Sequence, residues 1–276
     1  MIRPPIARTF KVDLPGSGFD NYFAISDIHS EHYCPVSHRV FLQHVDMVPR
    51  VNRKLIINGD MLDCLHFMGK PGDFRKMAAS IPIIENVLIP DSELEFQWGN
   101  DYLDMLQNYF DEIYYIQGNH DWRYKNFALN YSPTAYKHHF DISLQLNLKK
   151  RGIQMIEYPD YLDVGNLTVT HGVRHGNNHN KAMYELVGRS ILYGHVHHYN
   201  CTSFVKRGVE CKAFSMPCMS LLSPEYQIKR GENNWSNGYA NFQVKPNGKF
   251  NMFMAEIYDG ELILPCGTML KGNNEI

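Results

Sequence analysis

Five short polar motifs in this sequence combine Asp, His and Asn, whose side chains bind divalent metal ions through oxygen and nitrogen. Each motif follows a short apolar run, so each stands where a predicted β-strand passes into a loop. A lone histidine after a strand is most often a satisfied polar residue, so the signal is the recurrence of the pattern. In chain order the motifs are Asp27-Ile28-His29, Gly59-Asp60-Met61-Leu62-Asp63, Gly118-Asn119-His120-Asp121, His171-Gly172 and Gly194-His195-Val196-His197.

Donors of these types suit hydrolysis of a phosphate ester assisted by two metal ions. Two divalent cations about 3.5–4 Å apart can turn a shared water into hydroxide near neutral pH and neutralise the phosphoryl oxygens. The five motifs contain no cysteine, which argues against a closed structural zinc site.

Apolar runs at residues 22–25, 54–57 and 113–116 predict buried strands that end just before the first three motifs. Residues 167–170 and 190–193 do the same for the last two motifs. The sequence therefore predicts that strand ends deliver all five polar loops.

Helical patterns lie between the first strands. Pro35 opens a segment with apolar residues at helical spacing, and Ser92 followed by Glu95 has the pattern of a capping box at a helix start. Gly and Pro residues in the stretch 64–90 predict an insertion beside the site. Short β-rich runs between turns predict a C-terminal β-meander over residues 200–265. Together these patterns predict an α/β fold of two packed sheets flanked by helices.

Composition limits the protein class. A chain of 276 residues can fold as one domain, and we expect a single domain over residues 1–276. The formal charge of −2 gives no general attraction to nucleic acid or to an anionic membrane.

The six cysteines are scattered without a C-x-x-C pair, which favours reduced thiols in the cytoplasm. With no long apolar run, we expect no membrane span and no secretion signal. The oligomeric state stays open.

Taken in order, the five motifs resemble those of the calcineurin-like metallophosphoesterases, over about residues 22 to 198. The resemblance implies a four-layer αββα sandwich of two mixed β-sheets flanked by helices. It also implies a metal-dependent phosphoesterase that hydrolyses phosphate esters through a hydroxide bridging two metal ions.

The resemblance further implies a role for each motif side chain. One ion is bound by Asp27, His29 and His197, the other by Asn119, His171 and His195, and Asp60 bridges the two. His120 stabilises the phosphoryl transition state and protonates the leaving oxygen, and Asp63 orients it. We expect two divalent ions, Mn²⁺ first, with iron, Ni²⁺ or Zn²⁺ as alternatives.

Residues close to the motifs are candidates for further contacts. Arg123 and Arg174 could bind phosphate oxygens, although surface salt bridges are an equal alternative. His32 and His198 lie near enough in sequence to touch substrate. Asp121 either supports the metal site from behind or caps a loop or helix.

Departures from subfamily patterns narrow the substrate. Cys64 follows Asp63 where protein Ser/Thr phosphatases have Arg, and Asp121 stands where they have Glu. Purple acid phosphatases have a tyrosine ligand at the position of Asp63. The overall size and the segment after His198 resemble those of small bacterial or phage phosphoesterases, and we expect a phosphodiesterase or phosphatase acting on nucleotides or nucleic-acid ends. The alternatives are a protein Ser/Thr-type phosphatase and a non-catalytic scaffold with the same fold.

Overall fold

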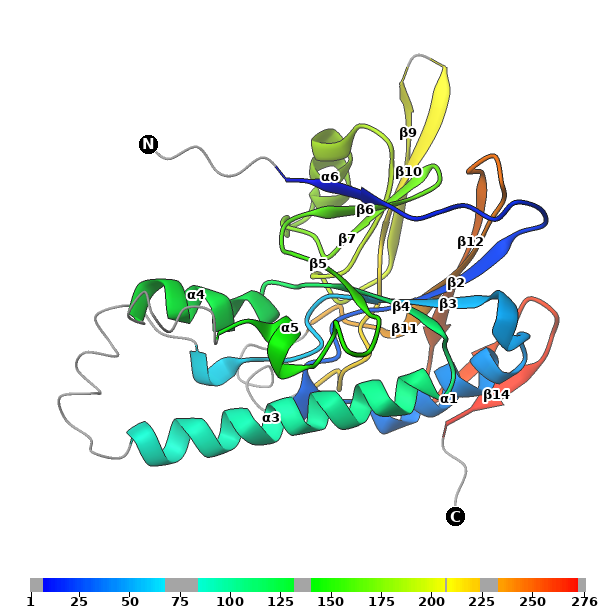
Figure 1. Ribbon diagram of the computed structural model, residues 1–276. Coiled ribbons are helices and arrows are strands. Elements are labelled where there is room, and N and C mark those ends of the chain that lie inside the picture. Colours follow the sequence, from blue (N-terminus) through cyan, green and yellow to red (C-terminus); the bar gives the residue numbers. More distant parts are fainter. Residues whose placement is uncertain (1–6, 68–83, 132–139, 207, 224–232, 273–276) are drawn as a thin grey trace.

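The computed structural model describes residues 7–67, 84–131, 140–206, 208–223 and 233–272. It contains two six-stranded mixed sheets, which we call the β2 sheet and the β7 sheet (Figure 1). The β2 sheet has the order β12 (Phe250–Ile257), β11 (Asn237–Val244), β2 (Asp20–Ile25), β3 (Arg53–Asn58), β4 (Glu112–Ile116) and β5 (Gln154–Ile156). The β7 sheet has the order β1 (Thr9–Lys11), β6 (Tyr161–Val164), β7 (Leu167–Thr170), β8 (Ser190–Tyr193), β10 (Val209–Ser215) and β9 (Asn200–Lys206).

Helices and a small hairpin complete the described fold. The helices are α1 (Pro35–Asp46), α3 (Ile84–Gln107), α4 (Asp121–Tyr131), α5 (Ile142–Gln145) and α6 (His179–Val187). Short 3-10 turns are η1 (Ser30–His32), η2 (Arg50–Asn52) and η3 (Leu65–Phe67), and β13 (Glu261–Ile263) pairs with β14 (Met269–Lys271). Within the described residues, no helix is both long and apolar enough to cross a bilayer.

Successive side chains along the strands point to opposite faces of each sheet, and this produces four layers. In β2, Tyr22 and Ala24 face the core between the two sheets, whereas Phe23 and Ile25 face a second core. That second core lies under α1 and α3, which cover the outer face of the β2 sheet (Figure 1). Helix α6 covers the outer face of the β7 sheet through Met183. The expected αββα sandwich is therefore confirmed.

Parallel pairing places the motif loops at one edge. Strands β2, β3 and β4 run parallel, as do β7 and β8, so within each sheet the carboxyl ends of these strands lie side by side. Ligand sites form at such ends in open α/β sheets. A hydrogen bond from His171 Nδ1 to the Asn58 carbonyl, 2.9 Å long, joins the ends of β7 and β3 across the two sheets.

Two predicted features differ from the structure. The helix predicted to start at Ser92 begins earlier, because α3 already runs from Ile84, and the Glu95 carboxylate serves tertiary hydrogen bonds instead of a cap. The strands beyond residue 200 form hairpins in different sheets, with β9 and β10 in the β7 sheet and β11 and β12 in the β2 sheet. Of the insertion predicted at 64–90, residues 68–83 lie outside the described residues.

We expect His38 to make stability depend on pH. The side chain is buried on α1, with hydrogen-bond contacts of 2.9 Å to the Cys34 carbonyl and 2.7 Å to the Tyr102 hydroxyl. Burial lowers the pKa of His38 from 6.5 to about 4, against the opposing effect of the Cys34 carbonyl. Between these two pKa values His38 is protonated in the unfolded chain and neutral in the folded chain. The free energy of unfolding therefore falls by about 1.4 kcal/mol for each unit by which the pH falls.

Between pH 7 and pH 5 the free energy of unfolding of the His38→Gln variant should therefore fall by about 2 kcal/mol less than that of the parent. The effect acts only below the unfolded pKa of 6.5, which leaves about 1.5 pH units of this range. Urea unfolding at the two pH values, with the same metal content, measures this difference. An equal loss in parent and variant would show that His38 does not carry the dependence.

Candidate metal centre

The backbone at the motif loops is strained. Asp27, His29, Asp60, His195 and His197 have φ values of 53°, 50°, 51°, 71° and 60°. These angles belong to the left-handed region of backbone conformations, which residues other than glycine rarely adopt. Such strain persists only where the surroundings enforce it, and it clusters at functional sites. Here it collects on candidate ligands from three loops.

The motif glycines leave room for polar side chains. A Cβ on Gly118 would lie 2.0 Å from Asp60 Oδ1, and a Cβ on Gly59 would lie 2.3 Å from His171 Nδ1. Gly59 also has a φ of 86°, which suits glycine. Both glycines are therefore needed because the side chains of Asp60 and His171 pack directly against the backbone.

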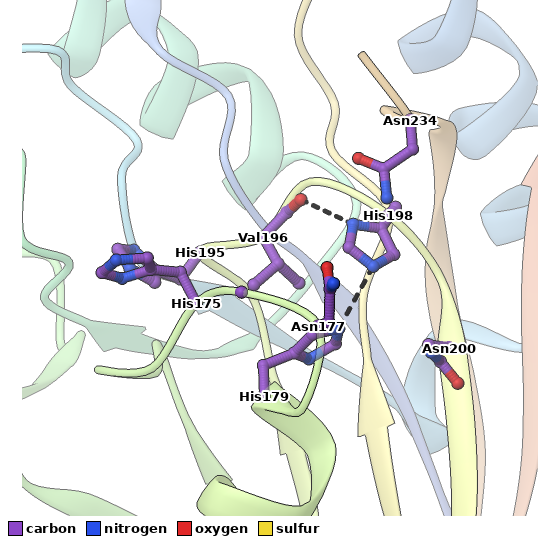
Figure 2. Close-up of a pocket in the computed structure, with 9 residues that line it drawn as sticks. His175, Asn177, His179, His195, Val196, His198, Asn200 and Asn234 are labelled. Carbon is purple, nitrogen blue, oxygen red and sulfur yellow. Dashed lines mark hydrogen bonds between the residues drawn. The ribbon is translucent and has the colours of Figure 1, made fainter.

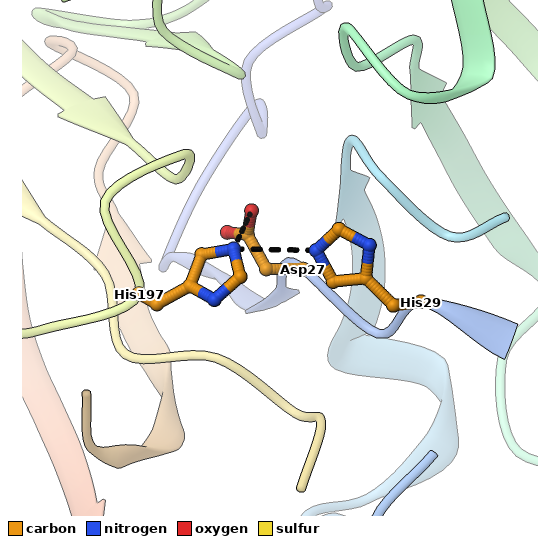
Figure 3. A group of neighbouring side chains, drawn as sticks. All are labelled: Asp27, His29 and His197. Carbon is orange, nitrogen blue, oxygen red and sulfur yellow. Dashed lines mark hydrogen bonds and ion pairs between the residues drawn. The ribbon is translucent and has the colours of Figure 1, made fainter. Parts of the chain in front are cut away.

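Asp27, His29 and His197 form the first group that could hold a metal ion (Figure 3). His29 Nε2 and His197 Nε2 are 3.2 Å apart, and His197 Nε2 is 3.1 Å from Asp27 Oδ1. The other carboxylate oxygen of Asp27 accepts hydrogen bonds from the Ser26 hydroxyl at 2.6 Å and the His195 amide at 2.9 Å. The three donor atoms thus converge on one point inside the protein.

Asp60, His171 and His195 form a second such group. His171 donates its Nδ1 hydrogen to the Asn58 carbonyl, so a neutral His171 turns the lone pair of Nε2 toward the site. Asp60 Oδ2 lies 3.1 Å and Asn119 Oδ1 lies 3.0 Å from that nitrogen. Three acceptor atoms facing one another are stable only with a proton or a cation among them, which fits a metal ion.

Carboxylates and histidines shift each other's charge at this site. Burial acts against a charged His171, but Asp60 outweighs it and raises the pKa of His171 to about 9. In the same way Asp27 raises the pKa of His197 to about 10 against the effect of burial. Burial, with the neighbouring His171, lowers the pKa of His195 to about 4. A metal ion entering the centre would displace protons from His171 and His197.

His120 and Asp63 lie in contact beside this centre. The Nδ1 of His120 is hydrogen-bonded to Asp63 Oδ1, which is also 3.1 Å from His29 Nδ1. Burial alone would raise the pKa of Asp63, but His120 and His29 lower it. Arg123 Nη2 donates to His120 Nε2 at 2.8 Å, so that nitrogen is an acceptor and Nδ1 carries the hydrogen. His29, Asp63 and His120 form the third group that could hold an ion, although Asp63 Oδ1 already contacts both rings.

Asp121 supports the Asp60 loop. The carboxylate is fully buried and accepts hydrogen bonds from the backbone N–H groups of Asp60 at 3.0 Å, Leu62 at 3.0 Å and Gly118 at 2.9 Å. Burial and the charge of Asp60 raise the pKa of Asp121 to about 7. Of the two interpretations open from sequence, support from behind the site fits these contacts.

Glu95 is a supporting residue that the sequence analysis missed. Its Oε1 accepts hydrogen bonds from the Ser30 hydroxyl at 2.6 Å and from the backbone N–H groups of Asp63 at 2.6 Å and Cys64 at 3.0 Å. Asp121 and Glu95 thus hold the loop from Asp60 to Cys64 from two sides. The sequence did hold a signal for it. Glu95 lies on the same face of the helix as Trp98 and Tyr102, which pack against the core, and a buried carboxylate needs hydrogen-bond partners.

The candidate substrate contacts lie in different surroundings. His32 Nε2 is 3.9 Å from Asp63 Oδ2, and His198 lines a pocket together with His195 (Figure 2). Arg123 is bound to Asp63 and His120 as described. Arg174 is exposed, and no hydrogen bond or ion pair joins it to another residue in the described part of the chain.

Residues 21–214 match the sequence model of a family described as calcineurin-like phosphoesterase. A solved structure of a conserved uncharacterized protein from Streptococcus pneumoniae, described as a "predicted phosphoesterase", is 13% identical and has a TM-score of 0.32. That match covers 86% of this chain and 98% of the other. No curated protein matches the sequence.

Removing the Glu95 carboxylate should weaken the fold through the Asp63 loop. Glu95→Ala leaves two backbone N–H groups and the Ser30 hydroxyl without their acceptor, and each such buried group costs about 1–3 kcal/mol. We expect a loss of at least about 2 kcal/mol in urea unfolding, and a smaller loss for Glu95→Gln, which keeps an acceptor oxygen.

Glu93→Ala is the matched control, because Glu93 is an exposed residue of the same helix. It should change stability by no more than about 0.5 kcal/mol. If Glu95→Ala proved as mild as Glu93→Ala, the loop would not depend on this carboxylate.

Proposed function

Because this chain belongs to the calcineurin-like phosphoesterases, and is therefore a metal-dependent hydrolase of phosphate esters, we propose that it works with two divalent metal ions. The ligands would be Asp27, His29 and His197 for one ion, Asn119, His171 and His195 for the other, and Asp60 as the bridge. The observation that carries this proposal is the convergence of acceptor atoms from Asp60 and Asn119 on the Nε2 of His171.

Bound divalent ions would supply Lewis acidity, which activates a water molecule and neutralises the phosphoryl oxygens. The protein's own residues keep the donors in place. The Asn58 carbonyl fixes the orientation of His171, and Asp63 does the same for His29. Asp121 and Glu95 hold the loop that carries Asp60. This arrangement fixes the donor atoms before a substrate arrives, which lowers the cost of reorganisation during the reaction.

The donor set also bears on the kind of ion. Carboxylate, amide and imidazole donors suit Mn²⁺, and they also accept iron, Ni²⁺ or Zn²⁺. No group that could hold a metal in the described residues includes a thiolate. We therefore propose Mn²⁺ as the working ion, with the other three as alternatives.

His120 is the proposed proton donor to the leaving oxygen. Its side chain is 21% exposed, so substrate can reach it, and Asp63 holds its Nδ1. Its Nε2 can donate only after Arg123 has released that atom and the atom has bound a proton, because in the structure the ring hydrogen is on Nδ1. A phosphate oxygen would compete with His120 for the guanidinium of Arg123, since guanidinium binds phosphate strongly. Substrate binding and the freeing of His120 would then be linked.

The proposed substrates are nucleotides or nucleic-acid ends, cleaved by phosphodiesterase or phosphatase activity in the cytoplasm. The chain departs from the protein Ser/Thr phosphatase pattern at Cys64 and Asp121, which supports a small-molecule or nucleic-acid substrate over a phosphoprotein. The formal charge of −2 means that a phosphate-rich substrate must be bound at the site itself.

Replacing the bridging carboxylate should abolish both metal binding and hydrolysis. Asp60→Asn removes the charge that faces His171, so we expect the metal content after dialysis to fall from two ions to fewer than one per chain. Elemental analysis measures the content. Hydrolysis of p-nitrophenyl phosphate and of its diester, after loading with each ion in turn, measures activity and separates phosphatase from phosphodiesterase.

The exposed Asp13 provides the control, because Asp13→Asn should keep both ions and the parent rate. Asp60→Asn protein with two tightly held ions and full turnover would rule out the bridging role. A parent protein inactive on both esters with every ion would rule out the proposed function.

His120→Asn should separate binding of metal from catalysis. The change removes the proposed proton donor but none of the proposed ligands, so the metal content should match the parent while kcat falls by about 10²–10⁴-fold. Elemental analysis and initial rates on the preferred ester test this. Unchanged kcat would mean that His120 does not take part in the reaction.

A further inference from the structure

A pocket of about 460 Å³ opens beside the candidate metal centre. Its lining includes His175, Asn177, His195, His198, Asn200 and Asn234, and we call it the histidine–asparagine pocket (Figure 2). His195 belongs both to this pocket and to the metal-holding group with Asp60 and His171. The pocket therefore adjoins the metal centre and has room for a group attached to a phosphoryl unit bound there. Its volume lies in the range of small-molecule sites.

We propose that the histidine–asparagine pocket binds the nucleobase of the substrate, which makes the preferred ester one that carries a nucleoside. The proposal rests on the proposed function, because the phosphoryl group must lie at the metal centre. It adds the part of the substrate that is recognised and the residues that recognise it.

A fixed chain of hydrogen bonds uses the ring nitrogens of two pocket histidines. His198 donates its Nδ1 hydrogen to the Val196 carbonyl at 2.9 Å, so a neutral His198 has an acceptor at Nε2. His179 Nε2 lies 3.2 Å from that acceptor and donates to it, and His179 Nδ1 then accepts from the Tyr193 hydroxyl at 2.5 Å. No nitrogen of either ring is left to bind a ligand. Because His179 is itself buried, of the two rings only that of His198 reaches into the pocket, and it can offer only its surface, which suits the face of a flat, π-bonded group.

The amides of the pocket have the opposite character. Asn177, Asn200 and Asn234 are exposed, and within the described residues no hydrogen bond engages their side chains. Each amide presents a donor and an acceptor together, the combination that pairs with the edge of a nucleobase. The pocket thus combines ring surfaces with free amide edges.

Charge excludes other ligand groups. None of the described residues that line the pocket is Lys, Arg, Asp or Glu. A second phosphate or a carboxylate would find no lysine or arginine to pair with there, and a lipid chain would cover the amides without hydrogen bonds. A neutral, planar group with donors and acceptors on its edge matches both the surfaces and the amides, and a nucleobase is such a group.

A competition assay with the metal-loaded protein tests the proposal. The four common ribonucleoside 5′-monophosphates and ribose 5-phosphate compete against the p-nitrophenyl ester that the protein hydrolyses faster. Ribose 5-phosphate has the same phosphate and sugar but no base. Stacking and edge contacts to a base are worth about 1–3 kcal/mol, so the best nucleotide should have an apparent inhibition constant about tenfold or more below that of ribose 5-phosphate.

The double variant Asn177→Ala/Asn200→Ala should reduce this ratio to less than about threefold. The control Asn251→Ala, at an exposed position of the edge strand β12, should keep the parent ratio. Equal constants for nucleotides and ribose 5-phosphate in the parent would overturn the proposal. So would a preference that survives in the double variant.

Failure of the proposed function gives a different result, namely no hydrolysis of either reporter with any ion. In that case titration calorimetry of the same ligands with the metal-loaded protein gives the ratio directly. Tighter binding of a nucleotide than of ribose 5-phosphate in that measurement would support the proposal that the pocket binds the nucleobase. Equal binding would overturn the proposal.

Discussion

The structure depends on the burial of two carboxylates, Asp27 and Asp60, which are 0% and 1% exposed. A charged carboxylate removed from water is costly unless hydrogen bonds and positive charge surround it. Backbone amides supply part of this, since His195 donates to Asp27 and His120 donates to Asp60. The facing histidines supply the rest, as protonated rings or as ligands of a shared cation. The same pairing that stabilises the buried charge therefore prepares the site for metal ions.

The sandwich makes that pairing possible by joining loops from two sheets. Asp27, Asp60 and Asn119 follow parallel strands of the β2 sheet, and His171 and His195 follow parallel strands of the β7 sheet. The core between the sheets fixes the separation of the two sets of loops. Glycines at 59 and 118 then allow the side chains to approach the backbone closely. The site is thus a property of the interface between the sheets.

Much of this arrangement was visible in the sequence. The strands before His171 and His195 were predicted with the bounds that the structure has, because both are short runs rich in residues that favour strands and each ends at a glycine-containing polar motif. Helix α6 was not predicted, since polar residues at its start hide its short apolar face. Glu95 was assigned to a cap because local spacing cannot show a tertiary partner on another loop. For Arg123 the sequence left a phosphate contact and a surface salt bridge as equal alternatives, and it could not show that the side chain is bound to His120 and Asp63.

The left-handed backbone at five candidate ligands has a consequence for dynamics. Each such residue costs about 1–3 kcal/mol of strain. The strain summed over the five residues is comparable with the net free energy of unfolding of a typical protein, about 5–15 kcal/mol. The loops at the sheet edge are thus the segments where a chelator would first promote local unfolding, while the strands behind them stay protected from hydrogen exchange. Rigidity at the centre would then vary with the concentration of free metal ions, as mass action requires.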